Sequence, residues 1–489
     1  MGIGMRIKQA VQDWLEIQPS IGESITIQEV NSFQGTCFRN LLWYRGDPAE
    51  LHQYYTQIDD MMGNTKFWAA VSTTGINFRK IHTGLPGLII DMLADIVIDA
   101  LNMVEIQSNY DAGEIWKEIQ EENDFKDLVK QAIIDVFVEC DGAFKLSYDT
   151  DISKYPIIQF YSGLNVDFEY KMGRLDTIVF KNYYTKKGGK YVLYEYYSKD
   201  GIKYKLVKNN MQEVNLNELP ETKGLEEIHD NGFRMAIPMM FNKSKKFKGR
   251  GQSIIDKKID DFDSYDEVWS QWIEAIRDNK TTTYIPECLI PNDDNGKLLK
   301  PNTWDKRYVQ IGNNGKEGEP DRVLRETGQF DYEKMLQSYI TALDLCLQGL
   351  ISPSTLGIDV KKLDNADSQR EKEKVTQYTR NKVIRVLEKV LPAVAVMSLK
   401  AYDMARGKTV GDYEATADFG EYSSPSFEAT VETISKARPG QAVMSIERSV
   451  EELYGDSLTK EEKEEEVKRL KEEAGIIEKD EPSIIGGEI

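Results

Sequence analysis

Apolar residues recur every three to four positions over several long segments, a spacing that predicts amphipathic helices. One such helix is predicted over residues 252–278 and a second over 332–350. Their apolar positions are Ile255, Ile259, Phe262, Trp269, Ile273 and Ile276 in the first helix, and Leu336, Ile340, Leu343, Leu347 and Leu350 in the second. Because the two helices are of similar length and flank a short insertion, we expect them to pack as an antiparallel pair.

The N-terminal part of the chain is also predicted to be helical. The segment Asp47-Pro48-Ala49-Glu50 combines an N-cap residue, a proline at the first helical position and a glutamate at the third, which predicts a helix start. The most apolar stretch, 85–104, carries Asp91, Asp95 and Asp99 on one face. Three carboxylates make a membrane-spanning helix very costly, so this stretch is expected to be an amphipathic helix with one wet or partner-facing edge.

Two more long helices are expected, at 115–140 and 368–406. The second begins at the capping box Ser368-Gln369-Arg370-Glu371 and ends at Gly407. Pro392 is expected to kink it. A rod of this length is typical of a protein that works within an assembly.

Two segments follow a strand pattern instead. Residues 143–208 contain runs of Tyr, Phe, Val and Ile separated by turn signals at 171–174, 187–189 and 199–201, which predicts an antiparallel meander. The insertion 280–330 contains the strand-like runs TTTYIPECLIP and RYVQI, separated by Asn- and Gly-rich turns. The fold class is therefore predicted to be α+β and mainly helical.

The helix 252–278 also carries an acidic stripe at helical spacing, formed by Asp256, Asp260, Asp263, Glu267, Glu274 and Asp278. Like charges four residues apart are slightly unfavourable, and a solvated face usually mixes both signs. The stripe therefore indicates that this edge faces a partner that it repels rather than binds.

Positive charge is most concentrated just before this helix. The basic run is Lys243, Lys245, Lys246, Lys248 and Arg250. Two interpretations remain open, a solvated loop or a contact to a phosphate or an acidic neighbour.

Composition excludes several functional classes. Lys and Arg number 62 against 82 Asp and Glu, a net charge of −20 that disfavours a protein whose affinity comes from neutralising phosphates. The 3 His and 4 Cys are scattered, without the spacing of a zinc site or a disulfide framework. Neither a phosphate loop nor a nucleophile elbow is present, so we expect no enzyme activity, no cofactor and no metal.

The order of these segments resembles the portal proteins (head-to-tail connectors) of long-tailed bacteriophages and prophages of Gram-positive bacteria. Four stretches carry the resemblance. They are NFRKIHTGLPGLIIDMLADIV, GRGQSIIDKKIDDFDSYDEVWSQWIEAIRDNKTTTYIPECLIP, STLGIDVKKLDNADSQREKEKVTQYTRNKVIRVLEKVLPAVAVM and ADFGEYSSPSFEATVETISKARPGQAVMSIERSVEELYG. None is a catalytic signature, and it is their order along residues 70–475 that makes the match specific.

The resemblance implies a domain plan and a function. The expected domains are a wing at 1–250, stem helices at 252–278 and 332–350, a clip at 280–330, a tunnel loop at 353–366, a long kinked wing helix and return strand at 368–430, and a crown and tail at 431–489. The chain is expected to form a ring of twelve copies at one capsid vertex, through which double-stranded DNA is packaged and ejected. Its expected partners are the terminase large subunit, the head–tail adaptor and the major capsid or scaffold protein. It is expected to assemble in the bacterial cytoplasm, to reside in the virion and to have no membrane contact.

The same resemblance gives roles to particular residues. The acidic stripe is expected to line the channel, where a negative wall repels phosphate and lets DNA slide. Tunnel-loop residues are Ser354, Thr355, Lys361 and Lys362, and clip residues for partner binding are Asn292, Asp293, Asp294, Lys297, Asn313 and Lys316. Two alternatives remain, another oligomeric virion scaffold or adaptor, or a nuclease that holds metal with its carboxylates.

Overall fold

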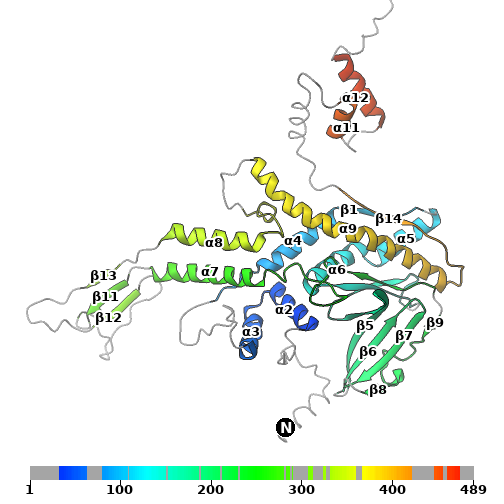
Figure 1. Cartoon of the computed structure of the whole chain (residues 1–489), viewed down its shortest axis with the longest axis horizontal. Coiled ribbons are helices and arrows are strands. Elements are labelled where there is room, and N and C mark those ends of the chain that lie inside the picture. Colours follow the sequence, from blue (N-terminus) through cyan, green and yellow to red (C-terminus); the bar gives the residue numbers. More distant parts are fainter. Residues whose placement is uncertain are drawn as a thin grey trace, which may run out of the picture. The chain divides into compact units, whose positions relative to one another are not determined.

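The computed structural model describes residues 32–62, 80–107, 110–149, 152–186, 189–209, 212–229, 232–279, 282–286, 289, 307–311, 323–326, 331–358, 366–420, 445–454 and 460–473. The chain divides into two compact units, Met1–Phe419 and Gly420–Ile489. Helices and several small sheets make up the described part, so the fold class is α+β as predicted (Figure 1).

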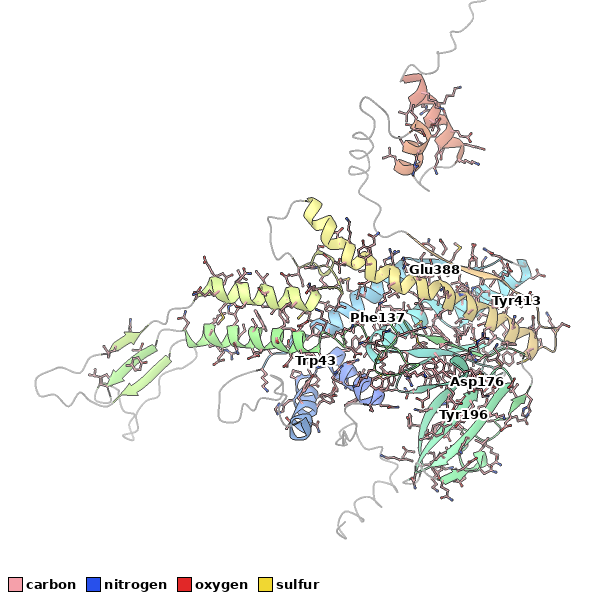
Figure 2. The ribbon with its side chains drawn as sticks, viewed as in Figure 1. Trp43, Phe137, Asp176, Tyr196, Glu388 and Tyr413 are labelled. Atoms are coloured by element: carbon pink, nitrogen blue, oxygen red, sulfur yellow. The ribbon has the colours of Figure 1, made fainter. Side chains whose placement is uncertain are left out.

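The core of the first unit is built on α2 (Phe33–Arg45), α4 (Leu85–Asp99), α5 (Tyr110–Glu122), α6 (Phe125–Glu139) and α9 (Ala366–Ala405). These helices turn their apolar faces toward one another, and the largest fully buried side chains include Trp43, Trp116 and Phe137. Trp43 and Phe137 are labelled in Figure 2. Full burial of a large apolar side chain stabilises the fold by roughly 1.5–3 kcal/mol. This contiguous core fixes the framework from which the other elements project.

Several predicted helices have different ends in the structure. The helix expected at 252–278 begins only at Ile259, and the helix expected from 368 begins at Ala366. The helix expected at 115–140 is divided at Asn123 and Asp124, because the Asn123 amide bonds the carbonyl of Pro156 and accepts from the Ile158 N–H, at 3.0 and 2.7 Å. The helix expected to reach Val104 stops at Asp99 and is followed by β1 (Leu101–Ile106), which pairs antiparallel with β14 (Ala415–Phe419). A strand far away in the sequence therefore decides where that helix ends.

The predicted meander is confirmed but forms two sheets. The three-stranded sheet has the order β10-β2-β3, with β2 at Gly142–Ser147, β3 at Ile157–Ser162 and β10 at Ala236–Met239. The larger sheet has the order β4-β5-β6-β7-β8, with β9 paired to β7. Its strands are β4 (Val166–Lys171), β5 (Arg174–Lys186), β6 (Gly189–Tyr197), β7 (Gly201–Lys208), β8 (Gln212–Val214) and β9 (Ile228–His229).

Backbone geometry accounts for the first hairpin of the larger sheet, and packing accounts for its tyrosines. Met172 and Gly173 both have positive φ, 50° and 79°, as the tight turn between β4 and β5 requires. Tyr191 and Tyr197 are buried, whereas Tyr183 is exposed. Lys145 of the neighbouring sheet reaches Glu195 at 3.1 Å, and both are buried. Packing therefore accounts for much of the tyrosine content.

The predicted antiparallel pair is formed by α7 (Ile259–Asp278) and α8 (Tyr332–Leu347). Between them in the sequence lie β11 (Thr282–Pro286), β12 (Arg307–Ile311) and β13 (Leu324–Glu326), a sheet of order β12-β11-β13 in which β11 and β12 are parallel. The predicted strand run RYVQI is confirmed as β12, whereas among the described residues of the first predicted run only TTYIP forms a strand, β11. The inserted sheet and its two flanking helices match the sequence-based order.

The remaining elements also follow the predicted order. A short turn, η4 (Ser354–Leu356), precedes the 40-residue helix α9, which contains Pro392 and ends where Gly407 adopts a φ of 65°. A second short turn, η2 (Leu216–Glu218), follows β8. The helix α3 (Pro48–Met62) begins as predicted, with Asp47 accepting from the Ala49 N–H at 2.8 Å. The second unit contains α11 (Ile446–Tyr454) and α12 (Lys460–Glu473).

Candidate functional site

The pair α7–α8, called here the helical hairpin, is held together by aromatic side chains. The hydroxyls of Tyr265 and Tyr339 are 2.6 Å apart, and the ring of Tyr339 lies 5.4 Å from both Trp269 and Trp272. Trp272 also contacts Tyr332, with ring centroids 6.0 Å apart. Tyr265 in the first half of α7 meets Tyr339 in the middle of α8, whereas Trp272 nearer the end of α7 meets Tyr332 at the start of α8, which confirms the antiparallel arrangement.

The observed seam differs from the predicted one in its second half. Ile259 and Phe262 are buried as expected, but Ile276 is 48% exposed. Tyr265 and Trp272 take the places next to α8. Trp269 of the predicted seam does contact Tyr339, and together with Tyr265 and Trp272 it forms an aromatic contact with α8.

The acidic stripe does not form one uniform edge in the single chain. Asp256 precedes α7, because residues 252–258 are not helical, and its Oδ1 accepts from Arg39 at 3.1 Å and from Asn40 at 2.7 Å. Asp263 is buried. Asp260, Glu267 and Glu274 lie on a different face of α7, where Asp260 is exposed and the other two are partly exposed. Of Asp278, only the backbone lies within the described residues.

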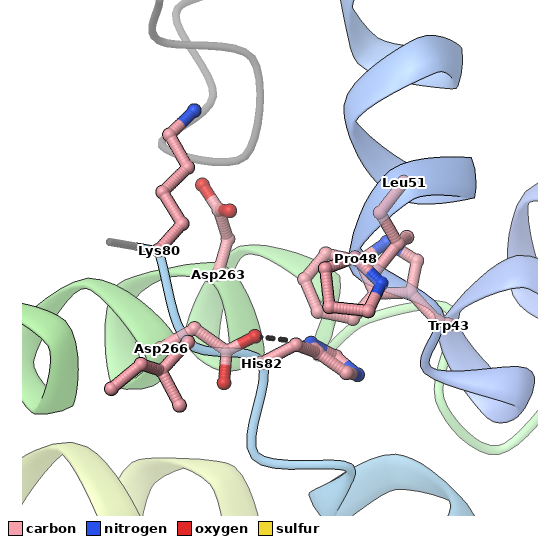
Figure 3. Close-up of a pocket in the computed structure, with 8 residues that line it drawn as sticks. Trp43, Pro48, Leu51, Lys80, His82, Asp263 and Asp266 are labelled. Carbon is pink, nitrogen blue, oxygen red and sulfur yellow. Dashed lines mark hydrogen bonds and ion pairs between the residues drawn. The ribbon is translucent and has the colours of Figure 1, made fainter. Parts of the chain in front are cut away.

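The inner face of α7 is a polar joint to the segment 80–84. Asp266 lies 2.5 Å from Nδ1 of His82 (Figure 3). It also accepts from the Thr83 N–H and hydroxyl, at 3.0 and 2.7 Å. Ser270 accepts from the Ile81 N–H at 2.9 Å. Sequence reasoning missed this joint, although the acids Asp263 and Asp266 three residues apart on a half-buried helix were a usable signal.

A small cavity adjoins this joint. It has a volume of about 30 Å³ and is lined by Trp43, Pro48, Leu51, Lys80, Ile81, His82, Asp263 and Asp266. Burial lowers the pKa of Lys80, while the charge of Asp263 acts to raise it. The cavity has room for a water molecule rather than for a substrate.

The predicted tunnel-loop and clip residues are only partly described. Ser354 and Thr355 lie in η4, and the Thr355 hydroxyl is 3.0 Å from that of Thr376 on α9. Lys361 and Lys362 lie outside the described residues, and so do Asn292, Asp293, Asp294, Lys297, Asn313 and Lys316. Their proposed roles stay predictions.

The basic run has two structurally different parts. Arg250 is held by Asp141 at 2.8 Å and by Asp167 at 3.0 Å, and its guanidinium lies 3.7 Å from the ring centroid of Phe33. Burial raises the pKa of Asp141, while Arg250 acts to lower it. Lys243, Lys245, Lys246 and Lys248 are exposed instead. Only the lysines are therefore available to a partner.

The described residues show neither a membrane span nor a metal cluster. Among their helices, none combines the length and hydrophobicity that crossing a bilayer requires. Within the same ranges, no group of three His, Cys, Asp or Glu is placed to hold a metal ion. Asp91 and Asp95 instead lie close to protein partners, the Tyr44 hydroxyl and Lys130.

Comparison with known proteins identifies no family. No family model matches the chain, and no curated protein matches it. Among solved structures, it is similar to a chain in the neck of a native GTA particle computed with C12 symmetry. The sequences are 10% identical, the TM-score is 0.40, and the match covers 78% of this chain and 92% of the other. A match at this level assigns no function.

Proposed function

We propose that the chain is a portal-type subunit. Twelve copies would form a ring at one capsid vertex, and double-stranded DNA would pass through its centre during packaging and ejection. The ring would dock the terminase large subunit first and the head–tail adaptor later. We propose that the chain has no catalytic activity of its own.

The helical hairpin with its inserted sheet is the observation that carries this proposal. The elements follow one another in the order α7, inserted sheet, α8, η4, α9 and β14, the same order as in the sequence resemblance. Each helix of the hairpin packs on the other with one face and leaves another face exposed. An exposed hairpin of this kind can be completed by neighbouring copies, which a closed ring supplies.

The charge of α7 supports DNA as the cargo of the ring rather than as a bound ligand. Asp260, Glu267 and Glu274 share one face, and the side-chain partners of the two glutamates are Gln271 and Arg277 on the same helix. Phosphates near this face would be repelled over a screening length of about 8–10 Å. A repelling wall lets a duplex slide, because no attractive contact has to break at each step.

Imaging the purified full-length chain by negative-stain electron microscopy tests the proposal. We expect rings of about twelve copies with a central hole. Monomers, filaments or solid particles would contradict it and favour a different scaffold or adaptor protein. Metal-dependent hydrolysis of DNA by the purified chain would favour the nuclease alternative.

Charge reversal tests the role of the exposed acids. The variant Asp260→Lys, Glu267→Lys, Glu274→Lys is expected to form rings but to slow or stall packaging, because attractive contacts brake the duplex. Asp263 is left out because it is buried, and its replacement would disturb the joint. The matched neutral variant, with Asn and Gln at the same three positions, should package DNA at a rate between those of the native chain and the lysine variant. Normal packaging by the lysine variant would exclude the sliding mechanism.

A further inference from the structure

We propose that the exposed lysines of residues 243–248, called here the lysine loop, contact the acidic face of α5 in the next copy of the chain. The acidic face consists of Asp111, Glu114, Glu118, Glu121 and Glu122. The inference rests on the proposed ring and adds to it a contact surface and the surface of its partner.

The lysine loop is rigidly built. A bridge pairs Lys243 with Gly251, and the Ser244 N–H donates to the carbonyl of Arg250 at 2.9 Å. The Ser244 hydroxyl accepts from the N–H groups of Lys246 and Phe247, at 3.2 and 3.0 Å. Arg250 anchors the base through its carboxylate partners. Because these contacts hold the backbone of the loop, its binding costs little backbone entropy beyond that of ordering the lysine side chains.

The lysines of this loop lack internal counter-charges. Lys243, Lys245, Lys246 and Lys248 are exposed, and in the described part of the chain none of them has an ion-pair partner. The Nζ of Lys246 lies 4.9 Å from the ring centroid of Phe247, which is an aromatic rather than an anionic contact. Four cations within six residues repel one another, so an external anionic surface would stabilise them.

The acidic face of α5 is complementary to the loop in charge and in exposure. All five of its acids are exposed, and Glu114 pairs with Lys117 at 3.4 Å. Glu118, Glu121 and Glu122 have no ion-pair partner within the described ranges. The opposite face of α5 is buried through Trp116 and Ile119, which keeps the acids turned outward.

Within one chain the two surfaces are held apart by α6. The acidic face ends at Glu122, just before α6 begins at Phe125, whereas the lysine loop is bound to Asp141, just after α6 ends at Glu139. A helix of 15 residues spans about 22 Å, well beyond the reach of an ion pair. Complementary surfaces at opposite ends of one element suit a head-to-tail contact, the kind that closes rings.

The net charge favours a second copy over a nucleic acid as the occupant. Each chain carries −20, so neighbouring copies repel one another overall and need a local contact of opposite sign. The same net charge repels a polyanion such as DNA. Binding of nucleic acid to the loop is therefore an outcome that the test has to exclude.

Sedimentation velocity of the full-length chain can measure the concentration at which half of it forms rings. The loop variant is Lys245→Glu, Lys246→Glu, Lys248→Glu, and the α5 variant is Glu118→Lys, Glu121→Lys, Glu122→Lys. Each is expected to raise the half-assembly concentration by roughly tenfold or more. The combined six-residue variant keeps the net charge of the native chain and should return to within about threefold of it.

The control variant is Lys199→Glu, Lys203→Glu, Lys223→Glu, which makes the same charge change at exposed lysines around the larger sheet. It should shift half-assembly by less than about twofold. The contact would be overturned if the loop variant assembled as readily as the native chain. It would also be overturned if the loop and α5 variants both assembled less readily and the combined variant did not recover. Either result would leave the ring proposal intact. If the native chain forms no rings, the proposed function fails first. Loss of binding to a short DNA duplex in the loop variant, with assembly unchanged, would also overturn the contact and assign the loop to phosphate.

Discussion

The helices of the core and the helical hairpin differ in how their faces are covered. In the core, α4, α6 and α9 bury residues such as Leu93, Ile133 and Leu391 completely. The buried residues of α8 are Leu343, Cys346 and Leu347, all near the end that joins the rest of the unit. Tyr332, at the end next to the inserted sheet, is 55% exposed. The core is complete within one chain, whereas the end of α8 next to the inserted sheet is largely exposed in the single chain.

The largest expected effect tests the core. Phe137→Ala should lower the free energy of unfolding by roughly 3–5 kcal/mol, because a fully buried ring leaves a cavity behind. Ile276→Ala on the exposed part of α7 should cost less than about 1 kcal/mol in the unassembled chain. Urea denaturation followed by circular dichroism measures both. Equal effects would show that the hairpin is as well covered as the core.

A smaller effect is expected at the polar joint that connects the two regions. Asp266→Asn should cost roughly 1–3 kcal/mol, because it weakens the acceptor of His82 and Thr83 in a buried setting. Hydrogen exchange at the Thr83 amide should quicken in this variant, since that N–H donates to Asp266. Unchanged exchange there would contradict the anchoring role of the joint.

The core should also show a pH dependence that comes from Asp135. Burial, with a smaller contribution from Glu139, raises the pKa of Asp135 from 3.8 to about 7. The folded state therefore holds a proton that the unfolded state releases, and stability should fall as pH rises from about 4 to about 7. Asp135→Asn should remove this fall and stabilise the chain by roughly 1–2 kcal/mol at pH 8, less than the full shift implies because the group is half-buried. If the free energy of unfolding of the variant fell with pH between 4 and 7 as steeply as that of the native chain, the pH dependence would not come from Asp135.

The smallest effect is expected on the exposed acidic face of α7. Asp260→Asn should change the free energy of unfolding by less than about 0.5 kcal/mol, because the side chain is exposed and has no side-chain partner in the described chain. Under the proposed function, its effect should appear instead in the rate of DNA packaging. A loss of stability comparable to that of Asp266→Asn would mean that the face belongs to the folded core.

Much of the architecture could be predicted from the sequence. Periodicity predicted the helices now seen as α7 and α8, the capping box and Gly407 predicted α9, and turn residues predicted the hairpins of the larger sheet. Asp47 marked the start of α3. Each of these signals is local, because it depends on residues within one or two turns of chain. These local signals also predicted the order of the elements, and that order is the basis of the resemblance on which the proposed function rests.

The role of each individual acid depended on tertiary structure. Asp256, Asp260 and Asp263 have the same charge and a helical spacing, yet the first pairs with Arg39, the second is exposed and the third is buried. The sequence determined that the segment is acidic and mostly helical. Only the tertiary structure decided which carboxylates pair with another side chain, line a cavity or face water, because burial and pairing depend on residues that are distant in the chain.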